Sequence, residues 1–245
     1  MVARGLAQSR ARARDLILRG RVTVDGAPAE KPSLGVDAGT EILVAGETAW
    51  VSRAAEKLVA GLDVFAVDPT GRRCLDLGAS TGGFTEVLIA RGAAAVAAVD
   101  VGHGQLHPRI AADPRVTSIE GLNARDLAAA DLPFAPDLVV ADVSFISLRL
   151  ALTPALALAA PAAAGVFLVK PQFEVGRDGV GKGGIVRDPA LADAAAAEIA
   201  GWLDGRDGWR VAGLVPSPIA GGDGNREFLL GAVRAEDARR AKDSP

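Results

Sequence analysis

Short apolar runs alternate with helix-like patterns along most of this chain. In the helix-like segments apolar residues recur every three or four positions, whereas the apolar runs are continuous, as in buried strands. From Ser52 onward the predicted elements are a helix that begins near that residue, strand 73–77, helix 83–91, strands 94–100, 116–120 and 137–142, helix 147–159, strand 165–170, helix 189–204, and strands 209–217 and 226–233. This alternation predicts an α/β fold with a mostly parallel sheet and helices on both faces.

The ends of these strands indicate where a functional site lies. The last two predicted strands flank the Gly-Gly-Asp-Gly segment 221–224 and are expected to form an antiparallel hairpin at one edge of the sheet. In open sheets of this kind, ligands bind beyond the carboxyl ends of the strands. Four polar residues fall at such ends: Asp76, Asp100, Asp142 and Lys170.

The first part of the chain has a different pattern. A helix capped by Ser9 and stopped by Gly20 precedes a strand over 21–24, an Asp-Gly turn at 25–26 and a last strand over 41–44. The predicted division is a small α+β domain over 1–46, a linker over 47–51, a large domain over 52–234 and a polar tail over 235–245.

Composition narrows the class of protein. With 49% hydrophobic and 23% charged residues among 245, the chain is typical of a globular protein. The one cysteine, Cys74, falls in a predicted core strand, which excludes a disulfide framework and a cysteine-based zinc site and favours the reducing cytoplasm. Segment 150–169 has no charged residue, but its alanines and prolines favour a helix and a strand over a membrane span. We expect neither a membrane partner nor a bound metal.

The net charge of −3 conceals a basic N-terminus. Residues 1–22 contain six arginines and a single acid. A local basic face on an acidic protein is typical of an RNA-binding appendage, and the alternative is a solvated amphipathic helix with excess charge.

One glycine-rich segment points to a nucleoside cofactor. Residues 74–85 read C-L-D-L-G-A-S-T-G-G-F-T, and the next strand ends at Asp100. Glycines allow close approach of the backbone to a ligand, and an acid after the following strand can bind a ribose diol. The spacing does not fit the G-x-G-x-x-G of dinucleotide folds. It resembles motif I of methyltransferases that use S-adenosylmethionine; the alternative is a glycine-rich turn in an unrelated α/β protein.

Four further residues stand where packing does not require polar groups. Lys57 lies in S-R-A-A-E-K-L, Asp142 in A-D-V-S-F-I-S, Lys170 in V-K-P-Q-F-E-V-G and Glu227 in G-N-R-E-F-L-L. These contexts resemble the Lys-Asp-Lys-Glu tetrad of FtsJ-type 2′-O-methyltransferases. Residues 5–26 resemble an S4 RNA-binding domain that lacks its usual first helical turn. Together, nearly the whole chain resembles the TlyA or hemolysin A family of ribosomal RNA 2′-O-methyltransferases.

The chemistry of a ribose hydroxyl agrees with this resemblance. The hydroxyl is a poor nucleophile near neutral pH and needs a base or strong orientation. Two lysines at one site would lower each other's pKa, as would desolvation, so Lys170 is expected to accept the hydroxyl proton while Asp142 and Glu227 hold the lysines. The non-catalytic alternatives are that Lys170 is a strand-end lysine that reaches solvent and that Lys57 is an ordinary helical lysine.

The resemblance also implies binding residues. For S-adenosylmethionine it implies Gly78, Ser80, Gly82, Asp100 and Asn123. For the phosphates of ribosomal RNA, on its own or within ribosomal subunits, it implies the arginines of the N-terminal segment: Arg10, Arg12, Arg14, Arg19 and Arg21.

Other interpretations remain open at this stage. A non-catalytic RNA-binding or ribosome-assembly factor is the main rival, although it would not need an intact tetrad, and a small-molecule methyltransferase is a third candidate. Segment 176–182 resembles a phosphate loop but lacks its Ser or Thr, so a mobile lid over the site is expected instead. The modified nucleotide, the ribosomal subunit and the oligomeric state are left open.

Overall fold

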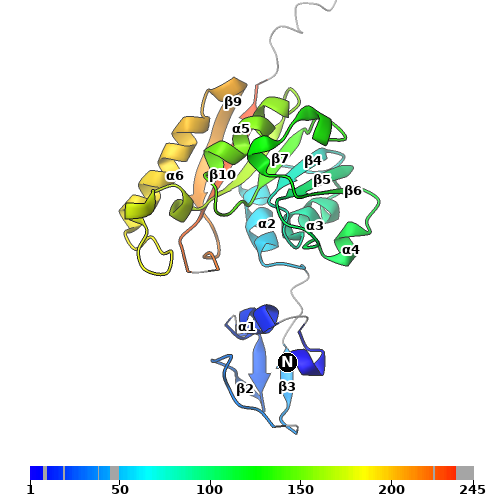
Figure 1. Ribbon diagram of the computed structural model, residues 1–245, viewed down its shortest axis with the longest axis vertical. Helices are drawn as coiled ribbons and strands as arrows, with labels where there is room; N and C mark the ends of the chain where they lie inside the picture. Colours follow the sequence, from blue (N-terminus) through cyan, green and yellow to red (C-terminus); the bar gives the residue numbers. More distant parts are fainter. Residues whose placement is uncertain (8–9, 19, 38, 45–49, 223, 236–245) are drawn as a thin grey trace, which may run out of the picture. The chain divides into compact units, whose positions relative to one another are not determined.

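The computed structural model describes residues 1–7, 10–18, 20–37, 39–44, 50–222 and 224–235 (Figure 1). The chain divides into two compact units, Met1–Ala49 and Trp50–Pro245. Each unit has its own hydrophobic core.

The first unit is a small α+β structure. Its elements are a single turn of 3₁₀ helix at Val2–Arg4, helix α1 (Arg10–Leu18), and strands β1 (Val22–Val24), β2 (Ala27–Pro28) and β3 (Ile42–Val44). The strands form an antiparallel sheet in the order β2-β1-β3. Leu16 of α1 packs with Val22 and Ala29 in the core. The predicted cap, Ser9, lies outside the described residues.

The predicted Asp-Gly turn joins β1 to β2. Asp25 and Gly26 have φ values of 49° and 80°, and Val24 pairs directly with Ala27. Two consecutive residues with positive φ are typical of the two-residue hairpin turn whose twist matches that of the strands. The short strand β2 that follows was not predicted.

The second unit is built on a seven-stranded sheet in the order β6-β5-β4-β7-β8-β10-β9 (Figure 1). Its strands are β4 (Arg73–Leu77), β5 (Ala95–Asp100), β6 (Val116–Glu120), β7 (Leu138–Ala141), β8 (Ala164–Val169), β9 (Trp209–Pro216) and β10 (Phe228–Arg234). Strands β4 to β8 are parallel, and β10 runs antiparallel to both of its neighbours, β8 and β9.

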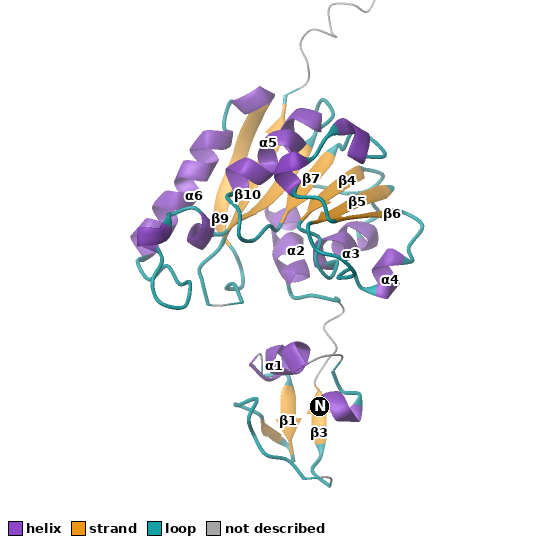
Figure 2. Ribbon diagram, in the orientation of Figure 1, coloured by secondary structure: helices purple, strands orange, loops and turns teal. Residues whose placement is uncertain are grey.

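Helices cover both faces of this sheet, as the alternating pattern predicts (Figure 2). Helices α2 (Ala54–Val64) and α3 (Gly83–Ala90) pack on one face, and α5 (Leu148–Leu158) and α6 (Pro189–Leu203) on the other. The short helix α4 (Pro108–Ala111) follows β5 and was not predicted. Single 3₁₀ turns occur at Ala124–Asp126, Ala129–Asp131, Pro171–Phe173, Arg177–Gly179 and Arg206–Gly208.

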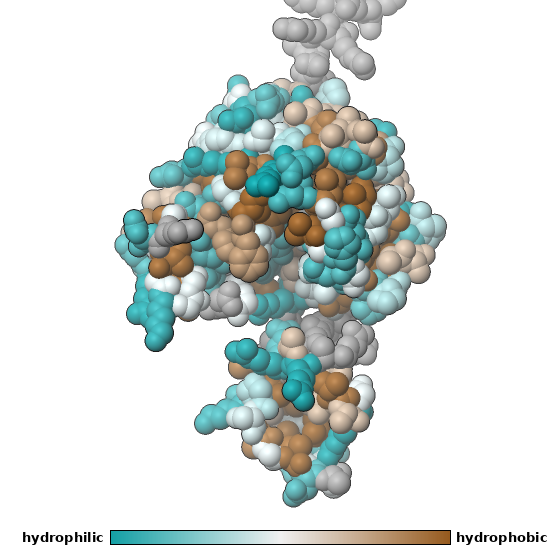
Figure 3. Space-filling model, viewed as in Figure 1, coloured by the Kyte–Doolittle hydropathy of each residue, from teal (hydrophilic) through white to brown (hydrophobic). Residues whose placement is uncertain are grey.

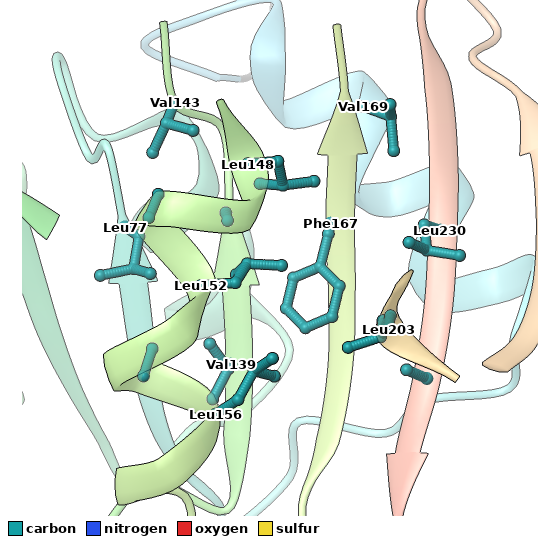
Figure 4. Close-up of a cluster of buried hydrophobic side chains, with 14 of the residues drawn as sticks. Leu77, Val139, Val143, Leu148, Leu152, Leu156, Phe167, Val169, Leu203 and Leu230 are labelled. Atoms are coloured by element: carbon teal, nitrogen blue, oxygen red, sulfur yellow. The ribbon is translucent and has the colours of Figure 1, made fainter. Parts of the chain in front are cut away.

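Leucines on one face of α5 form part of the larger of the two hydrophobic cores in this unit. Leu148, Leu152 and Leu156 recur every four positions and face Phe167 of β8 (Figure 4). Such spacing places side chains on one stripe of a helix, so α5 is fixed against the sheet. Strand β7, which precedes α5, is buried along its whole length. The core therefore fixes the position of the loop between β7 and α5.

Two sequence interpretations are refined by the structure. The β9–β10 hairpin forms, but β10 lies inside the sheet and β9 is the edge strand. Glu227 immediately precedes β10 rather than beginning it.

The uncharged segment 150–169 folds as most of α5 and β8, as expected from its alanines and prolines. In the described part of the chain, no helix has both the length and the apolar character needed to cross a membrane. The visible face of the second unit mixes hydrophilic and hydrophobic residues (Figure 3).

Candidate active site

The loop between β4 and α3 brings the backbone of two strand ends together. Gly78 has a φ of 79°, and a Cβ atom there would lie 2.5 Å from the carbonyl oxygen of Asp142. Only glycine accommodates both the left-handed conformation and this close approach. The glycine-rich segment therefore packs directly against the end of β7.

A cavity of about 510 Å³ opens beyond the carboxyl ends of β4, β5 and β7. The predicted catalytic residue Asp142 lines it. Four of the predicted cofactor-binding residues line it as well: Gly78, Ser80, Asp100 and Asn123. A pocket at this end of a parallel sheet matches the general rule for ligand sites in such folds.

Asp100 is oriented by the loops around it. Its Oδ2 accepts a hydrogen bond of 2.8 Å from the backbone amide of Ser80, and its Oδ1 accepts one of 2.7 Å from the amide of Gly102. Each carboxylate oxygen has a second lone pair, so both can still accept a hydrogen bond from a ligand in the cavity. The two amides thus fix the Asp100 carboxylate and leave each of its oxygens able to accept a further hydrogen bond.

Asp76, at the end of β4, is an unusual buried acid. Its side chain is fully buried, Oδ2 accepts a hydrogen bond of 2.6 Å from the Thr85 hydroxyl, and Oδ1 has no hydrogen-bond partner among the described residues. Burial raises the pKa of Asp76 to about 7; the Thr85 hydrogen bond opposes this shift, and the nearby charges of Asp142 and Asp100 add to it. A cation bound nearby would favour the ionised form.

A second, smaller cavity of about 160 Å³ adjoins the first. It shares Gly78, Ser80, Asp142 and Ser144 with the larger cavity and adds Lys170 to the wall. Lys170 Nζ lies 2.6 Å from Asp142 Oδ1 and donates a hydrogen bond of 2.8 Å to Ser144 Oγ. The structure therefore brings together two of the four predicted catalytic residues at the boundary of the two cavities.

The other two predicted catalytic residues form a buried ion pair. Lys57 Nζ on α2 lies 2.5 Å from Glu227 Oε2, and their side chains are only 6% and 3% exposed. The position of Glu227 follows from the direction of β10, because Phe228 pairs with Val169 at the carboxyl end of β8. Glu227 and Lys170 thus extend adjacent strands at the same edge of the sheet, although neither Lys57 nor Glu227 lines the small cavity.

The remaining predicted residues occupy different places. Gly82 lines neither cavity; it caps α3 with a φ of 95° and allows Leu106 to approach closely. Arg10, Arg14 and Arg21 are exposed on the first unit. The side chain of Arg12 and all of Arg19 lie outside the described residues.

Three residues at the site were missed by sequence analysis. Gln105 lines the large cavity and approaches Ser80 Oγ at 3.3 Å, and Ser144 contacts Lys170. Phe145, next in the chain, has a φ of 64° and is 93% exposed at the cavity rim. A bulky residue with positive φ stores strain, which clusters at functional sites. Ser144 and Phe145 stand in A-D-V-S-F-I-S, a motif already singled out, and Gln105 follows the predicted strand that ends at Asp100, but sequence alone does not give their orientation.

The residues that follow the expected lid segment 176–182 are hydrogen-bonded to the loop that precedes β10. Asn225 is buried; its Oδ1 accepts a hydrogen bond of 2.9 Å from the Val186 amide, and its Nδ2 donates one of 2.8 Å to the Gly184 carbonyl. Buried amide side chains are costly unless they are paired, so these bonds hold the end of the segment in place. The expected mobility of residues 176–182 stays a prediction.

Comparison with known proteins gives matches over both units. The model of the FtsJ-like methyltransferases matches residues 50–234, and that of the S4 domain matches residues 1–42. The chain is 50% identical over 232 residues to the 16S/23S rRNA (cytidine-2′-O)-methyltransferase TlyA of Mycobacterium tuberculosis, covering 94% of this chain and 86% of that protein. It is 38% identical to hemolysin A of Brachyspira hyodysenteriae, covering 92% and 94% of the two chains. Among solved structures, a candidate hemolysin from Streptococcus thermophilus is 37% identical with a TM-score of 0.77, covering 100% of this chain and 88% of that one.

Proposed function

Because the chain belongs to the FtsJ-like methyltransferase family, we propose that it transfers a methyl group from S-adenosylmethionine to a ribose 2′-hydroxyl of ribosomal RNA. The observation that carries this proposal is the position of Lys170 in the small cavity, 2.6 Å from Asp142, which lines both cavities. One cavity accommodates the cofactor, and the smaller one leaves room beside Lys170 for a hydroxyl group.

The large cavity fits S-adenosylmethionine in shape and in charge. When bound, the cofactor supplies a methyl group that its positively charged sulfur has already activated. Gly78 leaves space where a side chain would block the loop, and Asp100 offers acceptors to the ribose hydroxyls. Asp76 lines neither cavity, but its buried carboxyl group, whose Oδ1 has no hydrogen-bond partner among the described residues, would favour a cation bound nearby when it is ionised. Asn123 and Gln105 at the cavity wall provide further polar contacts.

The tetrad residues have separate roles in this proposal. Bound S-adenosylmethionine would supply the methyl group to the ribose oxygen, and Lys170 Nζ would accept the proton that this oxygen loses. Asp142 stabilises the protonated lysine that results. The buried Lys57–Glu227 pair fixes the end of β10 beside the site. Since the methyl group is already activated, this chemistry needs no metal.

The RNA is held by both units. We assign RNA capture to residues 1–46 and methyl transfer to residues 52–234, joined by 47–51 and followed by the tail 235–245, although residues 45–49 and 236–245 lie outside the described structure. Exposed Arg10, Arg14 and Arg21 suit contact with phosphates, and Phe145 offers an exposed ring for stacking on a base. A ribosomal RNA substrate places the enzyme with ribosomes in the cytoplasm.

The test is methyl incorporation from labelled S-adenosylmethionine into isolated small subunits, large subunits, assembled ribosomes and naked ribosomal RNA. The relative from Mycobacterium tuberculosis is named for both 16S and 23S RNA, so we expect label in a ribose of one or both subunits. RNA binding without any incorporation would favour a non-catalytic assembly factor. Incorporation into small molecules but not RNA would also contradict the proposal.

We expect Asp100→Ala to weaken binding of S-adenosylmethionine about tenfold or more, because truncating a partner of a charged hydrogen bond costs roughly 1.5–3 kcal/mol. The loss is measured by calorimetry. Asp100→Asn keeps the shape and an acceptor for one loop amide, so it separates the loss of ligand contacts from collapse of the loop. Glu120→Ala, an acid at the end of the neighbouring strand β6 that lies outside the cavity wall, is the matched control. Unchanged affinity in a folded Asp100→Ala protein would contradict the assignment.

We expect replacing Arg10 and Arg14 together with glutamine to weaken RNA binding similarly for matched and unmatched RNAs. The two residues are exposed on one face of α1, four positions apart. Each phosphate contact contributes a slope of roughly −0.7 to −0.9 to the dependence of log affinity on log salt, so the slope should flatten by about one unit per lost contact. Binding titrations at several salt concentrations measure this, with Arg91→Gln in the other unit as control. An unchanged slope would show that α1 does not contact phosphates.

A further inference from the structure

We infer that Ser144 is a positioning residue that directs the lone pair of Lys170 toward the substrate hydroxyl. This inference rests on the proposed function and adds a fifth residue to the tetrad. Ser144 lies in the loop between β7 and α5, two residues after Asp142, and it lines both cavities. Its position is fixed from both sides, by the buried strand β7 and by the packed start of α5.

The two contacts of Lys170 Nζ differ in kind. Asp142 Oδ1 is 2.6 Å away, but within the described part of the chain this oxygen accepts no hydrogen bond, so the contact is a close approach of charges without alignment. Ser144 Oγ, by contrast, accepts a directed hydrogen bond of 2.8 Å from Nζ. Asp142 thus supplies charge that attracts one N–H bond of Nζ, and Ser144 fixes the direction of another.

Direction matters because an ammonium group rotates freely about its last bond. A neutral lysine has two N–H bonds and one lone pair in a tetrahedral arrangement, and it can accept a proton only along the lone pair. When Ser144 Oγ holds one N–H bond and Asp142 attracts the other, the remaining tetrahedral position is fixed. Since Lys170, Ser144 and Asp142 line the same small cavity, that position is left for a hydroxyl group bound there.

The test compares Ser144→Ala with Ser144→Thr and Ser147→Ala. Ser147 belongs to the same loop, but its hydroxyl caps the start of α5. It donates a hydrogen bond of 2.7 Å to Glu174 Oε2 and accepts one of 3.3 Å from the Arg149 amide. We expect Ser144→Ala to lower kcat by about 10-fold to 100-fold, the range for losing a hydrogen bond to a charged group. The KM for RNA and the affinity for S-adenosylmethionine should stay unchanged, threonine should recover most of the rate, and Ser147→Ala should lower stability without changing kcat.

The dependence of kcat on pH distinguishes a loss of Lys170 orientation from a change in its protonation. If Ser144 only favoured the charged form of Lys170, its removal would shift the profile of kcat to lower pH and restore the full rate at high pH. Loss of direction lowers the plateau itself, because even a fully neutral lysine is then misaligned. A full plateau in Ser144→Ala, or weaker cofactor binding with unchanged kcat, would overturn the inference.

A measurement without catalysis keeps the inference separate from the proposed function. Nitrogen-15 relaxation of the Lys170 ammonium group, assigned with Lys170→Arg, reports how tightly Nζ is held. We expect greater motion in Ser144→Ala than in wild type or Ser147→Ala. Equal motion in all three proteins would overturn the role of Ser144, even if every ribosomal substrate failed to be methylated. Greater motion combined with failed methylation would support the Ser144 contact and contradict the proposed function alone.

Discussion

Replacing Lys170 with alanine is expected to lower the rate of methyl transfer by roughly 10²–10⁴-fold, the usual contribution of a positioned general base. Lys170 lies at the wall of the small cavity and does not line the larger one, which is lined by four of the five residues expected to bind the cofactor. The affinity for S-adenosylmethionine should therefore stay nearly unchanged. Single-turnover methylation measures the rate, and calorimetry measures cofactor binding.

Arginine at position 170 distinguishes a base from a mere positive charge. A guanidinium stays protonated at every working pH, so Lys170→Arg should be as inactive as Lys170→Ala. Lys182→Ala, which removes an exposed lysine that lines neither cavity, is the control and should keep the wild-type rate. An active Lys170→Arg enzyme would mean that Lys170 positions the substrate but does not accept its proton.

Truncation of Glu227 is expected to cost about 3–5 kcal/mol of folding free energy, because it leaves the buried ammonium of Lys57 without a partner. Unfolding in urea, followed by circular dichroism, measures the loss in Glu227→Ala. An exposed pair offers a matched comparison: Arg91 and Asp63 lie 2.9 Å apart with side chains 41% and 55% exposed. Asp63→Ala should cost at most about 1 kcal/mol.

A double replacement then tests why the buried pair is retained. Lys57→Met together with Glu227→Leu removes both charges and keeps apolar volume, so its stability should be close to that of wild type or higher. If the pair serves catalysis, this stable protein should still lose most of its methylation activity. A stable and fully active double variant would show that Lys57 and Glu227 have only a structural role.

The sequence was sufficient to predict most of the large unit. Buried parallel strands are short apolar runs with sharp ends, and the bounds of β4 coincide with those predicted. The bounds of β6, a partly exposed edge strand, coincide as well. The order of the strands was not predictable in the same way, because it depends on contacts between distant segments. The predicted hairpin therefore formed, but its inner and outer strands were not distinguished.

The same limit applies to the site. The four tetrad residues were identified from their local contexts; in the structure Asp142 and Lys170 line the small cavity, and Lys57 and Glu227 form a separate buried pair. Which lysine faces which acid was not apparent, since the Lys57–Glu227 pair exists only because β10 runs antiparallel beside β8. Ser144 and Gln105 were missed because serine and glutamine are common in loops, and only their orientation distinguishes them.

The placement of β10 has a consequence for how the enzyme is made. Lys57 and Glu227 are 170 positions apart in the chain, and β10 lies between β8 and β9, both of which are synthesised before it. Contacts between such distant segments form slowly, and N-terminal parts of a chain fold first during synthesis. The nascent protein therefore has its cofactor loop long before it has a complete tetrad. An enzyme that acts on ribosomal RNA is thus expected to stay catalytically silent toward the ribosome that is making it until its last strand has emerged and docked.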